Sequence, residues 1–461
     1  MMKFQTMQHT VRYLAPALAL MVAAGCDTSV TNPGPVQDEF LDSLNAHQAV
    51  VTGASRNLSD ALDRVAYWGG ALTYEINPAG STGSFGIPSS VQAGRLELDF
   101  SADWNRVQLA RWAAENAGER FARVLPNIAG APAFASYGPA AEAALLAGYA
   151  NRLFGENFCQ VVFDGGGPEA FSVALIRAEA AFTQAASTAS AAGETDVATA
   201  AQAGRASVLA DLASYGLASW TDAAAAATGI ANTFVHTANY SDQDQSQGNY
   251  IMIASPGLGT YRAHTTWGTF YEDYFRTTGD TRVAWVVDPA QPFGDAGVSK
   301  FGGNVTLLPQ DKYNDPEDPI NLSSGWEMRL IQAEAALQTA GGAAAAVGFM
   351  NQRRADLGLT LLTVTTDAQA YTDLKLERAL ELWLEGRRLF DIRRWEANNI
   401  SGGISDVRDG IYGTGTAGSG AAIGNETAVG VLDTQLTTLA TNARCWPIGR
   451  SEVETNENVT R

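Results

Sequence analysis

Residues 370–396 read AYTDLKLERALELWLEGRRLFDIRRWE, and this stretch decides the predicted fold. Large apolar side chains recur in it at spacings of four, three and seven residues, at Leu376, Leu380, Trp383 and Phe390. That recurrence marks one face of an α-helix, so the pattern predicts one long helix. A second face carries acidic residues spaced by four with arginines interleaved, at Glu377, Glu381, Glu385, Arg378, Arg387, Arg388, Arg393 and Arg394.

The charged face of this helix predicts ion pairs. Three pairs have the spacing at which neighbours on a helix meet, namely Arg378–Glu381, Glu385–Arg388 and Arg387–Asp391. Arginine also holds carboxylates and loop carbonyls through bidentate hydrogen bonds. We therefore expect the helix to lie at a junction, where its arginines hold neighbouring segments in place.

A glycoside hydrolase is the enzymatic alternative for this helix, with Glu381 or Glu385 as its acid or base. Nearby arginines argue against it, because positive charges lower carboxyl pKa values and a general acid needs a raised one. The sequence also contains no nucleophile elbow and no phosphate-binding loop. We expect a chain that performs no catalysis.

Composition excludes several classes of protein. The chain has 461 residues, of which 46% are hydrophobic and 17% charged, with a net charge of −19. Such an acidic balance argues against nucleic acid as a partner, because phosphates need a basic surface. Three cysteines and four histidines occur without the CxxC or HExxH spacing of zinc sites, so we expect no metal and no cofactor.

The N-terminus has the pattern of a bacterial lipoprotein signal. Lys3 and Arg12 precede a short apolar run, and Ala23, Ala24 and Gly25 lead into Cys26. This pattern predicts a signal peptide over 1–25, acylation of Cys26 and a linker over 26–37. An ordinary secretory signal with a coincidental cysteine is the alternative. The segment is too short to span a bilayer, and no other stretch is apolar enough to do so.

Most of the remaining chain has helical periodicity. We expect helices over 38–66, 103–125, 140–154 and 171–186, and a helix pair within 198–227. Small residues and a large aromatic near the turn of that pair fit a tetratricopeptide-type repeat, although another helical hairpin would have the same pattern. Residues 229–305 are rich in glycine, threonine and aromatics, and there helical periodicity fades.

Four segments in the C-terminal third resemble the SusD/RagB family of bacterial outer-membrane lipoproteins. They are WEMRLIQAEA from Trp326, FMNQRRADLGL from Phe349, the LER, EGRR and DIRRW strings within 376–395, and WPIGRSEVETN from Trp446. The lipoprotein signal and the helical body occur in the same order as in the family. The resemblance covers nearly the whole chain.

This resemblance implies a mainly α fold, with a tetratricopeptide-like helical scaffold and a loop-rich C-terminal region. Residues 38–461 would form a single SusD-like domain, divided at about residue 310 into an N-terminal helical part and a C-terminal part. Its implied function is to capture oligosaccharides at the cell surface and deliver them to a SusC-like, TonB-dependent transporter. Peptide cargo is the alternative on the same scaffold. An outer-membrane lipid anchor is implied, although Asp27 after the lipidated cysteine leaves the exact membrane address open.

Ligand contacts in this family come from irregular loops that no motif marks. Aromatic side chains on such loops either stack on sugar rings or pin the loop to the body. We name as candidate ligand-binding residues Trp68, Tyr74, Trp267, His264 and Tyr313. Of these, Trp267 and His264 are expected to face solvent, although a buried, hydrogen-bonded His264 is the alternative. By the same resemblance, Asp280 and Arg282 are expected to form a structural turn.

Cys159 and Cys445 remain once Cys26 is assigned to lipid. Both belong to an exported chain, where disulfides persist, so we predict that they are bonded. Two buried thiols are the alternative. Two other patterns are set aside: a GxGxxG at 413–418 lies in a Gly/Ser-rich loop, and a calcium-like DxDxS at 242–246 lacks its twelfth-position glutamate.

Overall fold

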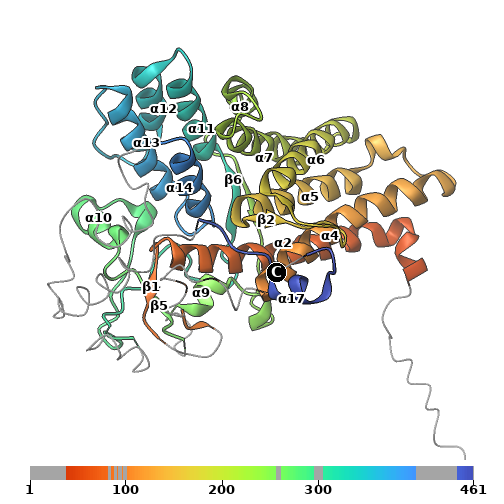
Figure 1. Ribbon diagram of the computed structural model, residues 1–461, viewed down its shortest axis with the longest axis horizontal. Helices are drawn as coiled ribbons and strands as arrows, with labels where there is room; N and C mark the ends of the chain where they lie inside the picture. Colours follow the sequence, from red (N-terminus) through yellow and green to blue (C-terminus); the bar gives the residue numbers. More distant parts are fainter. Residues whose placement is uncertain are drawn as a thin grey trace, which may run out of the picture. The chain divides into compact units, whose positions relative to one another are not determined.

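We analysed a computed structural model of the chain (Figure 1). It describes residues 38–80, 85–87, 91, 96, 101–255, 261–294, 305–400 and 444–459. The predicted signal peptide, Cys26, the linker and the GxGxxG at 413–418 lie outside the described residues. Among the described residues, no helix combines the length and apolarity needed to cross a bilayer.

The chain divides into two compact units, 1–46 and 47–461. In the first unit the described residues form the 3₁₀ helix η1 (Asp38–Asp42) and the start of α2 (Leu44–Leu72). All further elements belong to the second unit. Whether 38–461 acts as a single domain stays a prediction.

Helices that pack in sequence order form an array in the second unit (Figure 1). Its first half consists of α4 (Ser101–Val124), α5 (Gly138–Asn157), α6 (Phe171–Ala192), α7 (Thr195–Ser214) and α8 (Trp220–Ala227). Alanine-rich sequence favours these helices. Side-chain caps start some of them, as where Ser219 Oγ accepts a hydrogen bond from the Asp222 amide at 3.0 Å.

Two glycines let α5, α6 and α7 approach closely. A Cβ atom at Gly148 of α5 would lie 2.6 Å from the Phe182 ring of α6, and one at Gly204 of α7 would lie 2.4 Å from it. Both distances are far below van der Waals contact, so the large ring fits only because its neighbours lack side chains. This small-against-large packing supports the predicted tetratricopeptide-like scaffold.

The array continues in the C-terminal part of the chain. Helix α8 packs on α11 (Gly325–Gln338), which packs on α12 (Gly342–Asp356) and α13 (Asp367–Glu381). Buried apolar side chains of α7, α8 and α11 form one core cluster, and those of α11, α12 and α13 form the next. Asn351 of α12 holds the following loop by exchanging two hydrogen bonds with Leu362. The prediction of a mainly helical fold is confirmed.

Short strands, two short helices and turns connect the helices of the array. The strand pairs are β1 (Asn77–Pro78) with β5 (His264–Thr265), β2 (Gln160–Val161) with β3 (Glu169–Ala170), and β4 (Val235–Ala238) with β6 (Ile320–Ser324), all antiparallel. The helices are α9 (Tyr250–Ala254) and α10 (Phe270–Thr278). Asp280 caps the turn after α10 and pairs with Arg282 at 2.7 Å, which confirms the structural turn.

The prediction of one long helix over 370–396 is wrong. Helix α13 ends at Glu381, and α14 (Arg388–Ala397) begins after a six-residue break. Leu384 and Gly386 have φ of 58° and 72° in this break, a left-handed conformation that no α-helix can include. The turn is held from outside: the Leu384 amide donates to Glu75 Oε1 at 3.0 Å, and Gly386 lies against Ala66 of α2. Helical periodicity continued across the break, but these tertiary contacts override it.

The charged residues of this stretch pair with other elements. Arg387 contacts Glu327 of α11 at 2.8 Å and Glu156 of α5 at 3.1 Å. Arg394 of α14 pairs with Glu334 of α11, and Arg378 bridges the break to Asp391 at 2.8 Å. The predicted pairs within one helix are therefore wrong, whereas the expectation that the arginines hold neighbouring segments is confirmed. Burial alone would raise the pKa of Glu327, but Arg387, Arg152 and Arg378 lower it.

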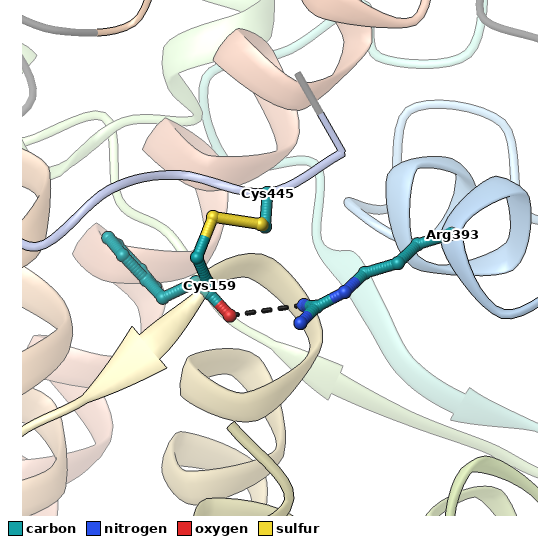
Figure 2. The surroundings of a disulfide bond; sticks show 4 residues. Cys159, Arg393 and Cys445 are labelled. Atoms are coloured by element: carbon teal, nitrogen blue, oxygen red, sulfur yellow. Dashed lines mark hydrogen bonds between the residues drawn. A yellow bond between two sulfur atoms is a disulfide. The ribbon is translucent and has the colours of Figure 1, made fainter. Parts of the chain in front are cut away.

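The C-terminal segment returns to α4 and α5. Cys159 and Cys445 form a disulfide across a sequence separation of 286 residues, as Figure 2 shows. Beside it, the Cys159 amide donates to Trp446 O at 2.8 Å, and Arg393 Nη1 donates to Phe158 O at 3.1 Å. Helix α17 (Arg450–Thr455) follows and packs on α4.

Replacing both disulfide cysteines, as Cys159→Ser with Cys445→Ser, should lower the free energy of unfolding by about 2–4 kcal/mol. The reason is that the bond closes a very long loop and so restricts the unfolded chain. Urea denaturation of the soluble chain from Asp27 onward measures the loss. As a control, a reductant should shift the wild-type midpoint and leave that of the variant unchanged. Equal midpoints for the two proteins without reductant would contradict the prediction.

Candidate functional site

Six aromatic rings gather beside the C-terminal half of α2. We call them the aromatic cluster: Tyr67, Trp68, Phe85, Tyr250, Tyr261 and His264. Tyr67 lies at its centre, with ring centroids 5.0 Å from Trp68, 5.1 Å from Tyr250 and 5.6 Å from His264. Phe85 stacks on Tyr250 at 4.7 Å and contacts Tyr261 at 4.4 Å.

The cluster has a buried base and a partly exposed rim. Tyr67, Tyr250 and His264 are buried. Trp68, Phe85 and Tyr261 are half-buried. Pocket sites for small molecules commonly combine apolar rings with a few placed polar groups, and half-buried rings can offer one face to a ligand. The rim of the cluster is thus the part that can contact a solute.

Hydrogen bonds and charges hold the base in position. Tyr67 Oη donates to Phe85 O at 2.6 Å, which ties the loop residue to α2. The Arg64 guanidinium lies 3.4 Å from the Tyr250 ring centroid, and Asp63 Oδ2 accepts from the Tyr250 amide at 3.0 Å. Asp63 lies one helical turn before Tyr67, and Arg64 lies one turn before Trp68. These four residues therefore share one face of α2, and that face positions the cluster.

Burial changes the protonation of two groups near the base. It raises the pKa of Asp63 to about 8, against the opposing effect of Arg64. It also lowers the pKa of His264 to about 3, so the imidazole is neutral near pH 7. Neither ring nitrogen of His264 has a hydrogen-bond partner in the part of the chain that the structure describes. His264, a residue of β5, therefore acts as a packing group that contacts Tyr67.

Four of the five predicted ligand-binding residues are buried, namely Tyr74, Trp267, His264 and Tyr313. The expectation that Trp267 and His264 face solvent is wrong. Trp267 packs in an apolar cluster with Val305, Leu307 and Leu308. Tyr313 Oη donates a hydrogen bond at 3.3 Å to the carbonyl oxygen of Leu384, which lies within the break between α13 and α14. A ring with no exposed face cannot stack on a sugar, so in this structure these residues support the loops.

Trp68 alone among the five keeps part of its side chain at the surface. Phe85 and Tyr261 share the rim with it but were not selected from the sequence. Both lie in aromatic-rich loops, and nothing in their spacing indicates which rings stay exposed. Tyr250 was missed altogether, although Asn249 before it caps α9 through its side chain.

The carboxylates of the hydrolase alternative lie in ion pairs. Glu381 Oε2 contacts Arg353 at 2.9 Å and Arg282 at 3.2 Å, and Glu385 Oε1 contacts Lys312 at 2.8 Å. Burial raises the pKa of Glu385, with Lys312 opposing it. The expectation that neighbouring cations dominate this carboxyl is therefore wrong. Within the described residues, no group of three or more His, Cys, Asp or Glu side chains could hold a metal ion.

A model of the SusD family matches residues 231–461. The chain belongs to the SusD family. No curated protein sequence matches it. A SusD superfamily protein from Bacteroides thetaiotaomicron VPI-5482 aligns at a TM-score of 0.61 with 14% identity, covering 91% of this chain and 98% of that one. The likeness shows that the fold is shared.

Two further crystal structures are similar to this chain in fold. A SusD-like carbohydrate binding protein from Bacteroides vulgatus ATCC 8482 aligns at a TM-score of 0.53 with 15% identity, over 76% of this chain and 83% of that one. A structure with xylogluco-oligosaccharide aligns at 0.55 with 13% identity, over 76% of this chain and 82% of that one. At these identities, both likenesses concern the fold.

Replacing the buried carboxyl as Asp63→Asn should stabilise the protein increasingly as pH rises from 5 to 8. With a folded pKa of about 8, Asp63 stays protonated in the folded protein while it ionises in the unfolded chain. The unfolded state then binds fewer protons, so wild-type stability falls over this range, and the variant avoids that loss.

Urea denaturation at pH 5 and pH 8 measures the effect. The difference in unfolding free energy between Asp63→Asn and wild type should grow by at least about 1 kcal/mol between the two pH values. Ser59→Ala removes a buried, non-titrating group from the same helix and should differ from wild type by the same amount at both. A constant difference for Asp63→Asn would contradict a raised pKa.

Proposed function

We propose that this chain is a surface lipoprotein that binds oligosaccharides and delivers them to a TonB-dependent transporter in the outer membrane. One observation carries the proposal: a chain of the SusD family presents the half-buried rings of Trp68, Phe85 and Tyr261 on a rigid, buried base. Partly exposed aromatic rings can stack on the apolar face of a sugar ring.

Preorganisation of the rim favours capture of a solute. Tyr67 and Tyr250 lie beneath the rim, and the Tyr67 hydroxyl fixes Phe85 through its carbonyl. Side chains already ordered before binding lose little entropy when a ligand arrives. Two structures of similar fold, one a SusD-like carbohydrate binding protein and one with xylogluco-oligosaccharide, support a glycan as cargo. Peptide cargo is the alternative, and a ligand panel separates the two.

The sequence and the family support the proposed anchoring and delivery. The lipobox-like residues before Cys26 support acylation there, and the 26–37 segment would separate the body from the lipid. A SusC-like transporter is the partner that the family implies. Co-purification of such a β-barrel with the full chain from membranes tests this step.

Replacing the rim tryptophan, as Trp68→Ala, should weaken oligosaccharide binding about tenfold or more, because truncating an aromatic anchor of a site typically costs more than 1 kcal/mol. Isothermal titration calorimetry of the soluble chain measures it, first on wild type against a panel of oligosaccharides and peptides. Trp326→Ala is the matched control, since Trp326 is also half-buried but lies on α11, outside the aromatic cluster. Equal affinity of Trp68→Ala and wild type would place the site elsewhere.

Removing the charge at Glu385, as Glu385→Gln, should lower the free energy of unfolding by about 1–3 kcal/mol, because it leaves the largely buried Lys312 ammonium without its charged hydrogen-bond acceptor. Glu396→Gln is the control: Glu396 pairs with Arg444 at the surface, where such pairs contribute less than about 1 kcal/mol. Urea denaturation measures both. Loss of glycan turnover with unchanged stability would instead favour the hydrolase.

A further inference from the structure

An exposed tryptophan on α4 is unused by the site described above. Trp112 is 52% exposed and Leu109, one turn earlier, is 48% exposed. Trp104 on the same helix is fully buried, so α4 places one indole in the core and the other at the surface. A single exposed leucine is ordinary, but an indole left half in water is a large apolar area.

A pocket of about 510 Å³ lies beside Trp112. It is lined by residues of α4, by the turn at 162–165 and by Glu452 of α17. Its volume falls within the range of small-molecule sites. It shares no residue with the aromatic cluster. The structure describes every residue that lines it.

The turn at 162–165 is held from several sides. The Gly166 amide donates to Phe163 O at 2.8 Å, and Asn458 Nδ2 donates to Gly165 O at 2.8 Å. Asp164 has a φ of 52°, which costs a non-glycine residue about 1 kcal/mol or more. Such a conformation persists only where surrounding contacts determine it, and here they fix the place of the Asp164 carboxylate.

A buried arginine orients this carboxylate. Arg111 Nη2 donates to Asp164 Oδ1 at 3.0 Å, while Arg111 Nε and Nη1 are held by Gln108 at 3.0 Å and Glu115 at 2.6 Å. The Asp164 side chain is nevertheless 63% exposed, so its second oxygen can accept a hydrogen bond from a ligand. An acceptor of fixed position thus lies in the same pocket as an exposed indole.

Two further side chains that line the pocket supply polar groups in fixed positions. Glu452 Oε2 accepts from Trp104 Nε1 at 3.3 Å, and Glu452 Oε1 accepts from Asn456 Nδ2 at 2.8 Å. Asn105 Oδ1 accepts from Ser451 Oγ at 2.9 Å, which fixes the amide and leaves its N–H groups for a ligand. These side chains are held before any ligand binds.

The chemistry of the pocket favours a neutral, hydroxyl-rich ligand. Asp164 and Glu452 are acidic, and Arg111 is already saturated by carboxylate and amide oxygens, so an anion would be repelled. Sugar hydroxyls can donate to the carboxylates and accept from Asn105, while the apolar face of a sugar ring covers the indole. The apolar area, two side chains wide, is small for a stable protein interface.

We propose that Trp112, Asp164 and Asn105 form a second carbohydrate-binding site, separate from the aromatic cluster. The inference rests on the proposed function for the class of ligand alone. A long glycan held at two places on one chain would bind with an affinity above that of either site.

Calorimetry and saturation-transfer NMR on the soluble chain test this site with defined probes: xyloglucan heptasaccharide, cellohexaose and maltohexaose. Trp112→Ala should remove a class of binding, or weaken it at least tenfold, while Trp68→Ala retains it. Asp164→Asn should weaken the same class without removing an aromatic ring. Leu361→Ala is the control, being similarly exposed but outside the pocket. Because Trp112 is exposed, its removal should leave the thermal unfolding midpoint unchanged.

The two proposals fail in different ways. If Trp68→Ala abolishes glycan binding and Trp112→Ala matches wild type, the second site is wrong and the proposed function stands. If Trp112→Ala alone loses binding, the second site stands and the aromatic cluster is not the glycan site. No binding of any probe by wild type overturns the second site. Loss of transporter co-purification in Trp112→Ala, with glycan binding intact, also overturns it in favour of a protein contact.

Discussion

Buried arginine–carboxylate pairs around the break between α13 and α14 hold the structure together. Arg387 reaches α5 and α11 through Glu156 and Glu327, and Arg394 reaches α11 through Glu334. A charge left alone in such surroundings would cost several kcal/mol, so each buried charge depends on its partner being present. Each pair can therefore form only where its partner element is already in place. This coupling explains why α5, α11 and α14 meet in one arrangement, and it holds the break against α2, which also carries the aromatic cluster.

Local patterns in the sequence predicted the helical body well, because each helix of the array buries one apolar face against its neighbour. Alanine-rich periodicity and caps such as Ser219 and Ser324 carry that information within a few residues. The break at 382–387 could not be found this way. It depends on Glu75 and Ala66, some 300 residues earlier in the sequence, which hold Leu384 and Gly386 in left-handed conformations. The ion-pair partners of the arginines could not be predicted for the same reason, because they lie on elements far away in the sequence.

The sequence predicted that aromatic side chains on loops form the candidate site, but it identified only one of the exposed rings. Aromatic-rich loops indicated where rings gather, and Trp68 lies on the rim of the cluster that they form. Tyr74, Trp267, His264 and Tyr313 have the same composition around them and are buried, because exposure of a ring is decided by what packs over it. Trp112 shows the converse. It follows the buried Trp104 by about two turns of α4, so helical periodicity alone places both near the same face. The indole of Trp104 is covered by Glu452 of α17, whereas that of Trp112 borders the pocket.

The disulfide in Figure 2 has a consequence for how the chain folds. Its two cysteines are separated by 286 residues, and the residues after Cys445 cover Trp104 and brace the turn that carries Asp164. A chain interrupted before Cys445 would retain an unpaired thiol at Cys159 and an uncovered indole on α4. Bond formation at Cys159 thus requires the segment around residue 445 to lie against the end of α5, so the state of this one thiol reports whether the C-terminal segment has docked.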